Sequence, residues 1–336
     1  MDISMNLKCN KLIAKYCINN GALRSIETYK FEIQNPIVMQ ICIEENGKRI
    51  ITLLSEEETE TITMYSVLLN LERLLNIFDG VFIPLSEISL YGNESIEAYN
   101  SLCVHLKKMR LKYFLSAPFL TVQTDRIVNY EDVLSEEMYE RWKEVLGELG
   151  VVNQMYLYAV SDSGMTNDIK CAFLIGLAEP LSEILRSEGI LLKKTVDKNG
   201  FLSLRSCLRI IINRYGTILF EKEKVFGIGK ILECLVNTRV NIMHIKKNQK
   251  TPKLEGKENV LYATKMSYLY RIVILEWIGV DEKYYINNLK KRIEDMETFG
   301  GVQNKMFERL KSSGRKGTRQ CVQLKTCNLA DRNSVK

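Results

Sequence analysis

Two side chains in the second half of the sequence have types and a spacing that suit the cleavage of a phosphodiester bond. Arg239 and His244 are five positions apart, and Lys246 and Lys247 follow directly. A histidine, with an ordinary pKa of about 6.5, can take a proton from a ribose 2′-hydroxyl or give one to a leaving 5′-oxygen. An arginine can hold two phosphate oxygens and stabilise the charge that develops in the transition state. The two lysines would add affinity for phosphate.

The helical spacing around Arg239 places it where an apolar residue is expected. At three- and four-residue steps it shares one stripe with Leu232, Leu235, Val236 and Met243. A guanidinium on a buried stripe needs an ionic partner or a cleft, and Asp168 and Glu179 are acidic candidates for ordering it. His244 lies about 140° around the helix from Arg239, so the two side chains would flank a groove. The alternative interpretation is a structural Arg–His pair in a helix that packs against polar loops.

Other kinds of chemistry have less support in the sequence. The only other histidine, His105, has no partner nearby and is expected to be partly buried and structural. Motifs for metalloproteases, phosphate-binding loops, dinucleotide folds and serine hydrolases are absent. The nine cysteines include no closely spaced pair and are expected to be mostly buried apolar residues. We expect no metal site and no cofactor.

The elements before residue 125 are expected to be mainly strands. Tyr29, Phe31 and Ile33 alternate with polar residues, which indicates a half-buried strand. Two apolar runs, Ile37–Ile43 and Arg49–Leu54, flank Asn46-Gly47 and predict a β-hairpin. The other elements expected here are a helix through residues 64–78 that ends at Gly80, strands at 81–85 and 88–90, and a helix at 98–111.

From Ser135 onward the pattern is helical. Ser135 is expected to cap a helix through Leu149, and Thr166 to cap a helix over 168–186 that Pro180 bends. Short connections join these helices to four more, as in an α-helical bundle. The later helices are expected at 203–220, 225–245, 260–278 and 282–296, with a polar, flexible connection at 247–257.

Charge is unevenly distributed along the chain. Of the net charge of +6, residues 305–336 contribute +7, from nine basic and two acidic side chains, so that the rest is close to neutral. With 46% hydrophobic and 26% charged residues, the composition is that of a globular protein. No run is long and apolar enough to span a membrane, and the N-terminus lacks the apolar core of a signal peptide, so we expect a cytoplasmic protein.

The predicted fold class is α+β, with a β-rich N-terminal domain followed by an all-α helical bundle. The predicted domains are a β-rich sensing or regulatory domain at 1–125, a connecting helical segment at 126–165, a helical domain at 166–298 and a basic, disordered tail at 299–336.

The segment from about 166 to 290 resembles the HEPN domain, a helical nucleotide-binding and ribonuclease module. Its hallmark, R-x4–6-H at the end of a helix, is matched by Arg239 and His244. The flanking segments Leu68–Ile83 and Arg214–Phe220 are similar to those of ApeA-type HEPN proteins of anti-phage defence. The family usually has a polar residue directly after the arginine, where this chain has Val240, with Asn241 one place later.

The resemblance implies a metal-independent endoribonuclease that acts as a homodimer in abortive infection, as a toxin to its own host. Arg239 would bind the scissile phosphate, His244 would act as general acid or base, and Asn241, Lys246 and Lys247 would contact RNA. tRNA is the candidate substrate, and the N-terminal domain would respond to a phage-derived trigger. Val240 favours the alternative, a catalytically silent HEPN module that binds nucleotide, RNA or a partner protein. An unrelated, monomeric helical protein with a chance motif is the third possibility.

Overall fold

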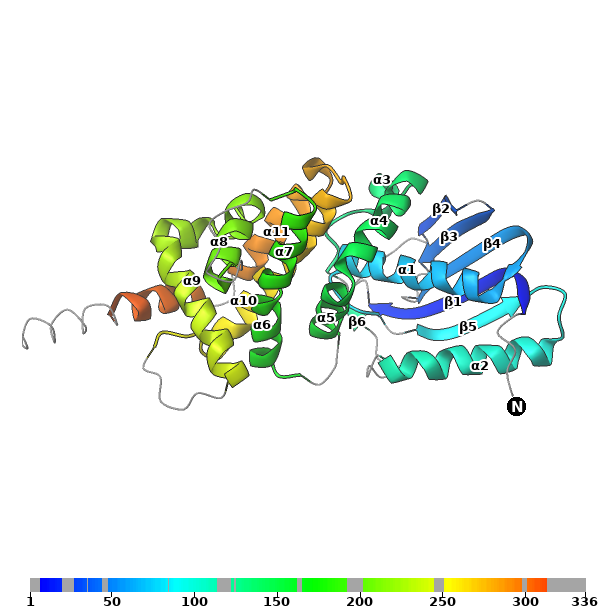
Figure 1. The fold of residues 1–336 in the computed structure, drawn as a ribbon, viewed down its shortest axis with the longest axis horizontal. Helices are drawn as coiled ribbons and strands as arrows, with labels where there is room; N and C mark the ends of the chain where they lie inside the picture. The colour runs from blue at the N-terminus through cyan, green and yellow to red at the C-terminus, as the bar shows by residue number, and fades with distance from the viewer. Residues whose placement is uncertain are drawn as a thin grey trace, which may run out of the picture. The chain divides into compact units, whose positions relative to one another are not determined.

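The structure is a computed structural model in which the chain divides into two compact units (Figure 1). The first unit comprises Met1–Thr166, Pro180–Lys193 and Ser267–Lys291, and the second comprises Asn167–Glu179, Lys194–Met266 and Arg292–Lys336. Both units therefore include parts of the range 166–298, which the sequence assigns to one helical domain. The structure describes residues 7–19, 27–34, 36–43, 48–83, 85–113, 122–123, 125–161, 165–191, 202–244, 251–297 and 301–312.

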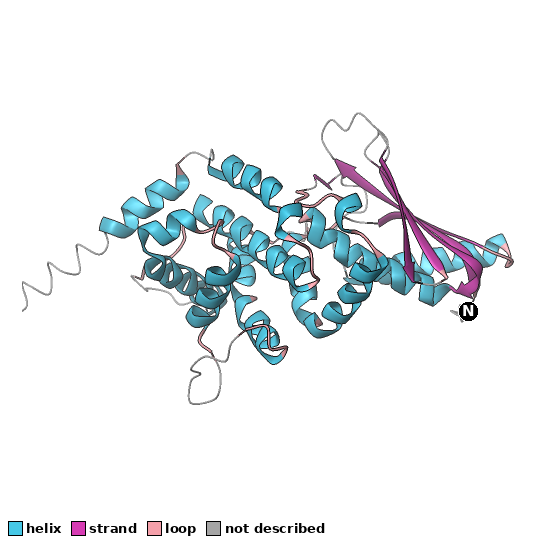
Figure 2. Cartoon of the chain, turned by 90° about the horizontal axis from the view of Figure 1, so that it is seen from above, coloured by secondary structure: helices cyan, strands magenta, loops and turns pink. Residues whose placement is uncertain are grey.

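The first unit contains a twisted sheet whose main strands are antiparallel (Figure 2). The strand order is β2-β3-β4-β1-β5, and β6 pairs in parallel with the end of β1. Alternate residues of β3 are buried, as expected for a sheet with one covered face. The strands are β1 (Lys8–Asn19), β2 (Glu27–Gln34), β3 (Ile37–Ile43), β4 (Lys48–Glu60), β5 (Leu85–Tyr91) and β6 (Val122–Gln123).

The strand predictions are confirmed for β2, for both strands of the hairpin and for the strand at 88–90, which lies within β5. The Asn46-Gly47 turn lies outside the described residues. The strand predicted at 81–85 is wrong for 81–83, which are irregular although Phe82 and Ile83 are buried. A short apolar run indicates burial, but it does not distinguish a strand from a buried loop.

Helices in the first unit begin and end close to their predicted positions. Helix α1 (Thr61–Asp79) ends at Gly80, whose φ of 70° is the left-handed conformation that glycine adopts without strain. Ser135 caps α4 (Glu136–Leu149) by accepting a hydrogen bond from the amide of Met138. The other helices that begin in this unit are α2 (Ile96–Tyr113), α3 (Tyr130–Val133), α5 (Val151–Val160), the 3₁₀ helix η1 (Glu282–Tyr284) and α11 (Ile286–Glu297).

The helix predicted at 168–186 is two helices, α6 (Asn167–Gly176) and α7 (Ala178–Ser187). The helix is interrupted by a turn at Leu177, three residues before Pro180. Pro180 itself lies in the first turn of α7, so the predicted bend at Pro180 is wrong. A proline is tolerated in a first turn because its missing N–H would have no helical acceptor there.

The second unit is helical in its described part. It contains α6, α8 (Leu204–Tyr215), α9 (Glu221–His244) and the first half of α10 (Lys257–Trp277). Helix α9 is kinked at Gly227, whose φ of 123° is outside the helical region. No helix in the described part of the chain is long and apolar enough to cross a bilayer.

The prediction that the chain is disordered from residue 299 is wrong for residues 302–312, which form a helix. Met306 and Leu310 are buried, and the ring of Phe307 stacks on Phe226 at a centroid distance of 4.2 Å. The sequence did not predict this helix because the tail as a whole is basic and the apolar residues recur at helical spacing over only three turns. Residues 313–336 lie outside the described part of the chain.

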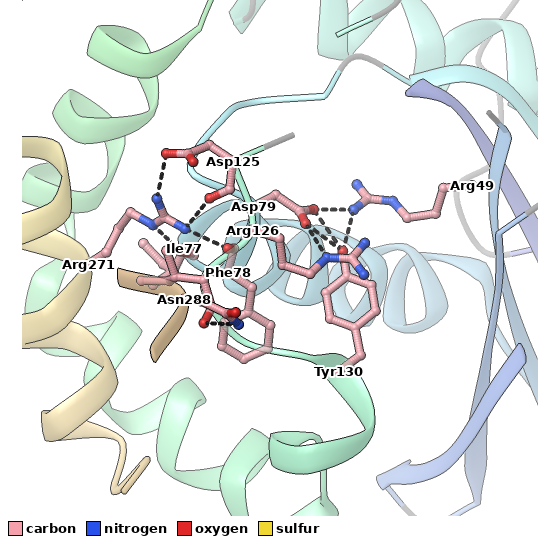
Figure 3. Close-up of polar contacts among 10 residues, drawn as sticks. Arg49, Ile77, Phe78, Asp79, Asp125, Arg126, Tyr130, Arg271 and Asn288 are labelled. Atoms are coloured by element: carbon pink, nitrogen blue, oxygen red, sulfur yellow. Dashed lines mark hydrogen bonds and ion pairs between the residues drawn. The ribbon is translucent and has the colours of Figure 1, made fainter. Parts of the chain in front are cut away.

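The end of α1 is held by a fully buried arginine of α10 (Figure 3). Nε of Arg271 donates to the carbonyl oxygen of Ile77 at 2.7 Å, and Nη2 donates to the carbonyl oxygens of Phe78 and Asp125 at 2.6 and 2.7 Å. The last carbonyls of a helix have no partner within it and carry partial negative charge. Arg271 therefore supplies hydrogen-bond donors to the last carbonyl groups of α1 and a positive charge next to their partial negative charge. A β-carbon at Gly80 would collide with this guanidinium, which is a second reason for glycine at that position.

Asp79, the last residue of α1, is the centre of an adjoining buried cluster (Figure 3). Its carboxylate accepts from Nη1 of Arg49 at 2.5 Å, from the Tyr130 hydroxyl at 2.8 Å and from Nε of Arg126 at 3.2 Å. Burial, followed by the neighbouring Asp79 charge, raises the pKa of Tyr130 to about 12. Tyr130 is therefore a neutral hydrogen-bond donor throughout the physiological range.

Replacing Arg271 by methionine is expected to lower the free energy of unfolding of the chain by about 3 kcal/mol or more. The reason is that buried carbonyl oxygens would lose their donors. Urea denaturation followed by circular dichroism measures the change. Arg141→Met is the matched control: Arg141 forms an exposed ion pair with Glu137, whose loss should cost less than about 1 kcal/mol. Equal effects of the two substitutions would contradict this role for Arg271.

Candidate functional site

The proposed catalytic residues lie on one helical segment. Residues 228–244 follow the kink at Gly227, and α9 ends at His244. The backbone therefore places Arg239 and His244 five residues apart at the C-terminal end of a helix, as the sequence predicts. The side chain of His244 and the residues Lys246 and Lys247 lie outside the described part of the chain, so their contribution to a site stays a prediction.

Arg239 is not on a fully buried stripe, so that part of the sequence interpretation is wrong. Leu232 and Leu235 are completely buried, but the Arg239 side chain is 29% exposed and Met243 is 48% exposed. The buried residue at this level of the helix is instead Thr238, the neighbour of Arg239. The packing on α9 shifts around the helix toward its end, which leaves the guanidinium at the border between core and surface.

Glu179 is the ionic partner of Arg239. Nη2 of Arg239 is 3.4 Å from Oε2 of Glu179, in the first turn of α7. A β-carbon at Gly176 would lie 3.9 Å from Nε of Arg239, so the guanidinium also lies beside the C-terminal end of α6, where a cation is favourable. Glu179 was one of two predicted candidates, and its pairing is confirmed. The other, Asp168, is exposed in the first turn of α6 and has no contact with Arg239 among the described interactions.

The ion pair of Arg239 is of the weak kind. Its atoms are at the long end of the hydrogen-bond range, and both side chains are partly exposed, at 29% and 38%. Exposed pairs of this kind contribute about 0–1 kcal/mol, because water and salt screen both charges. The carboxylate therefore lies beside the guanidinium without holding it strongly.

Asn241 is bonded within its own helix. Its Nδ2 donates to the carbonyl oxygen of Asn237 at 2.7 Å, one turn earlier. This bond uses one of the two amide N–H groups and directs the side chain back along α9. The predicted contact of Asn241 with RNA remains a prediction.

The connection that follows α9 is anchored in its second part. Residues 251–257, the second part of the connection predicted to be flexible, form buried contacts, and residues 247–250 lie outside the described part of the chain. Leu254 is buried, and its amide donates to Oγ1 of Thr238 at 2.8 Å. The Thr238 hydroxyl in turn donates to the carbonyl oxygen of Cys234 at 2.8 Å, and Nδ2 of Asn237 donates to the carbonyl oxygen of Pro252 at 3.0 Å. Helix α9 therefore binds, through Asn237 and Thr238, the end of the connection that leads from it to α10.

The helix at 302–312 contributes to the same anchor. Nη2 of Arg309 donates to the carbonyl oxygen of Lys253 at 2.8 Å and to Oε2 of Glu258 at 2.5 Å. The sequence alone did not indicate Thr238 or Arg309 as positioning residues. The only available signal was a polar residue inside an apolar helical pattern, which is too common to be specific.

Metal and thiol chemistry have little support here. Among the described residues, no group of three or more histidine, cysteine or acidic side chains is arranged to hold a metal ion. Burial raises the pKa of the Cys171 and Cys234 thiols to about 12, which disfavours the reactive thiolate. Five of the six cysteines with a described side chain are buried, as predicted. His105 is half-buried, in agreement with a structural role.

Comparison with models of known protein families finds no match, and comparisons with curated proteins and with solved structures find none either. The resemblance to HEPN proteins therefore rests on Arg239, His244 and the order of the helices around them.

Replacing Thr238 by valine is expected to increase the hydrogen exchange rate of the Leu254 amide by about tenfold or more. The amide would lose an acceptor worth about 1–3 kcal/mol in a buried setting. Thr238→Ser should retain the protection, because it keeps the hydroxyl. Thr264→Val serves as a surface control, since the Thr264 hydroxyl bonds only within its own helix among the described contacts. Unchanged protection in Thr238→Val would contradict the anchoring role of the hydroxyl.

Proposed function

We propose that this protein is a metal-independent HEPN endoribonuclease that cleaves RNA in anti-phage defence, with tRNA as the candidate substrate. The observation that supports the proposal is the setting of Arg239. Its guanidinium is partly exposed, is oriented by a weak partner and lies on the helix that ends at His244. A partly exposed guanidinium can form paired hydrogen bonds to two phosphate oxygens.

In the proposed reaction, a scissile phosphate replaces Glu179 beside Arg239. His244 removes the proton from the ribose 2′-hydroxyl, and the 2′-oxygen attacks phosphorus. The bond from phosphorus to the 5′-oxygen breaks, and a protonated general acid returns a proton to that oxygen. The products are a 2′,3′-cyclic phosphate and a 5′-hydroxyl. Arg239 stabilises the additional negative charge on the phosphoryl oxygens during the attack.

The proposal includes a homodimer, because one helix provides a single arginine and a single histidine. A second copy of α9 would supply the other pair, so that one histidine accepts a proton while the other donates one. Asn241, Lys246 and Lys247 would contact the RNA backbone on either side of the scissile phosphate. The β-rich part of the chain would respond to a phage-derived trigger.

The second candidate function is a silent HEPN module that binds nucleotide, RNA or a partner protein. Two observations favour it. Val240 stands where the family usually has a polar residue, and the charge of Arg239 is already matched by Glu179. Such a module would bind RNA or a partner with the same side chains but would leave the phosphodiester bond intact.

The ribonuclease hypothesis predicts cleavage of total tRNA by the purified chain in the presence of EDTA. The fragments should carry 2′,3′-cyclic phosphate ends. His244→Ala and Arg239→Ala should each lower the rate by about 100-fold or more, the usual contribution of a general acid or base or of a transition-state cation. His105→Ala replaces the only other histidine and should cleave like the wild type.

The outcomes separate the hypotheses. Cleavage that persists in His244→Ala would exclude this site. RNA binding without cleavage, together with normal growth of an overproducing host, would favour the silent module. A chain that is monomeric in analytical ultracentrifugation and neither binds nor cleaves RNA would exclude both.

Glu179→Gln is expected to strengthen RNA binding by about twofold to fivefold. The substitution removes an anion that competes with phosphate for Arg239, and exposed ion pairs are worth up to about 1 kcal/mol. Fluorescence anisotropy with a labelled RNA measures the change. Glu183→Gln removes a comparable surface pair, with Arg186 on the same helix, and should leave the affinity unchanged. Weaker binding by Glu179→Gln alone would mean that orientation of Arg239 matters more than competition.

A further inference from the structure

Strand β2 forms one border of the sheet in the first unit (Figure 1). Among the described residues it pairs with β3 alone, in an antiparallel register that runs from Glu27 opposite Ile43 to Glu32 opposite Val38. On a border strand, the backbone N–H and C=O groups of alternate residues point away from the sheet and can pair with another strand. The outer side of β2 is therefore a place where a further strand can be added.

The covered face of the sheet is less completely buried at β2 than on the neighbouring strand. Phe31 lies opposite Met39, and Tyr29 lies opposite Ile41. Met39 and Ile41 are completely buried, whereas both aromatic side chains of β2 are half-buried. Removing apolar surface from water favours association. A strand added beside β2 would bury more of the two aromatic rings.

The opposite face of β2 carries two exposed side chains of opposite charge, Lys30 and Glu32. Their partners on β3, Gln40 and Val38, are uncharged. Neither charge has an ion pair in the part of the chain that the structure describes. Opposite charges that lie directly across from each other on two strands attract, and like charges repel. Lys30 and Glu32 therefore select which strand lies beside β2 and in which register.

A second copy of β2 supplies the complementary charges in one register. In an antiparallel pair with its two-fold axis at Phe31, Lys30 of each copy lies opposite Glu32 of the other, and the two Phe31 side chains meet on the covered face. Moving the axis by one residue places Lys30 opposite Lys30, or Glu32 opposite Glu32, so that like charges repel. A half-step places the covered face of one sheet beside the opposite face of the other.

We propose that two copies of this chain associate through their β2 strands, in an antiparallel pairing centred on Phe31. The register of β2 against β3 shifts between Glu32 and Gln34, so the regular part of the new pairing is short. A contact of this size predicts a weak dimer that dissociates on dilution. This inference goes beyond the proposed ribonuclease activity, because the contact does not involve α9 and does not depend on catalysis.

Disulfide trapping tests the register directly. Lys30→Cys and Glu32→Cys variants of the full chain are oxidised separately and as a mixture. Only in the mixture do two new thiols lie directly opposite each other, whereas identical positions are diagonal neighbours about 7–8 Å apart, too far for a relaxed disulfide. We expect the mixture to form cross-linked dimer at least threefold faster than either variant alone, and the wild type controls for the native cysteines. Equal rates in all three samples, or no cross-link in any, would overturn the proposal.

Charge reversal tests the ion pairs of the same contact. Lys30→Glu and Glu32→Lys should each weaken self-association by about fivefold or more, because each places like charges opposite each other twice. The two substitutions combined restore opposite charges and should restore the wild-type affinity, which a folding defect would not do. Glu148→Lys, at an exposed position of α4, is the control and should associate like the wild type. Sedimentation at several concentrations measures the affinity, and a double variant no tighter than the single variants would overturn the proposal.

Discussion

The packing of the first compact unit depends on hydrogen-bond donors for the last carbonyl groups of α1. The carbonyls of Ile77 and Phe78 end a helix in a dry environment, and Arg271, almost two hundred residues later, provides their donors. The same guanidinium binds the carbonyl of Asp125, so it joins three distant parts of the chain. A buried charge with all its contacts in place is tolerated, but removal of one partner leaves the others desolvated and unpaired. This asymmetry makes the position intolerant of substitution.

The neighbouring Asp79 extends the same constraint to the sheet. Arg49 lies on β4, and Tyr130 begins α3, so the last residue of α1 fixes a strand and a short helix together. A carboxylate surrounded by two arginines and a neutral tyrosine is stabilised although it is fully buried. Two adjoining sets of buried polar contacts therefore meet at the C-terminal end of α1, and a third lies further along the helix, where the Tyr16 hydroxyl donates to the buried Glu72.

Helix α9 organises the second unit in a different way. Its first turn carries Glu223, which binds Lys265 and Tyr262 of α10, and its last turns carry Arg239 and His244. Between them, Thr238 binds the returning segment at Leu254, and the kink at Gly227 separates the two ends. The buried contacts of Glu223 and Thr238 are strong and structural, whereas the Arg239–Glu179 pair is exposed and weak. The proposed binding role of Arg239 depends on that contrast, because a group that must exchange partners cannot be locked in place.

The sequence by itself determined the features that depend on neighbouring residues. The alternation around Tyr29, the glycine that ends α1 and the serine that caps α4 are local effects of backbone geometry and hydrogen bonding, and all three are confirmed. The position of Arg239 and His244 at the end of a helix follows from the same periodicity.

Only the tertiary structure decided which side chains meet across long separations. Arg271 and the carbonyls of α1, Glu223 and Lys265, and Thr238 and Leu254 form pairs that no local spacing specifies. The degree to which Arg239 is buried, and the helix hidden in the basic tail, were decided in the same way. Burial is a property of the packed chain. Periodicity predicts which face of a helix is apolar, but it does not predict how far along the helix other segments pack against that face.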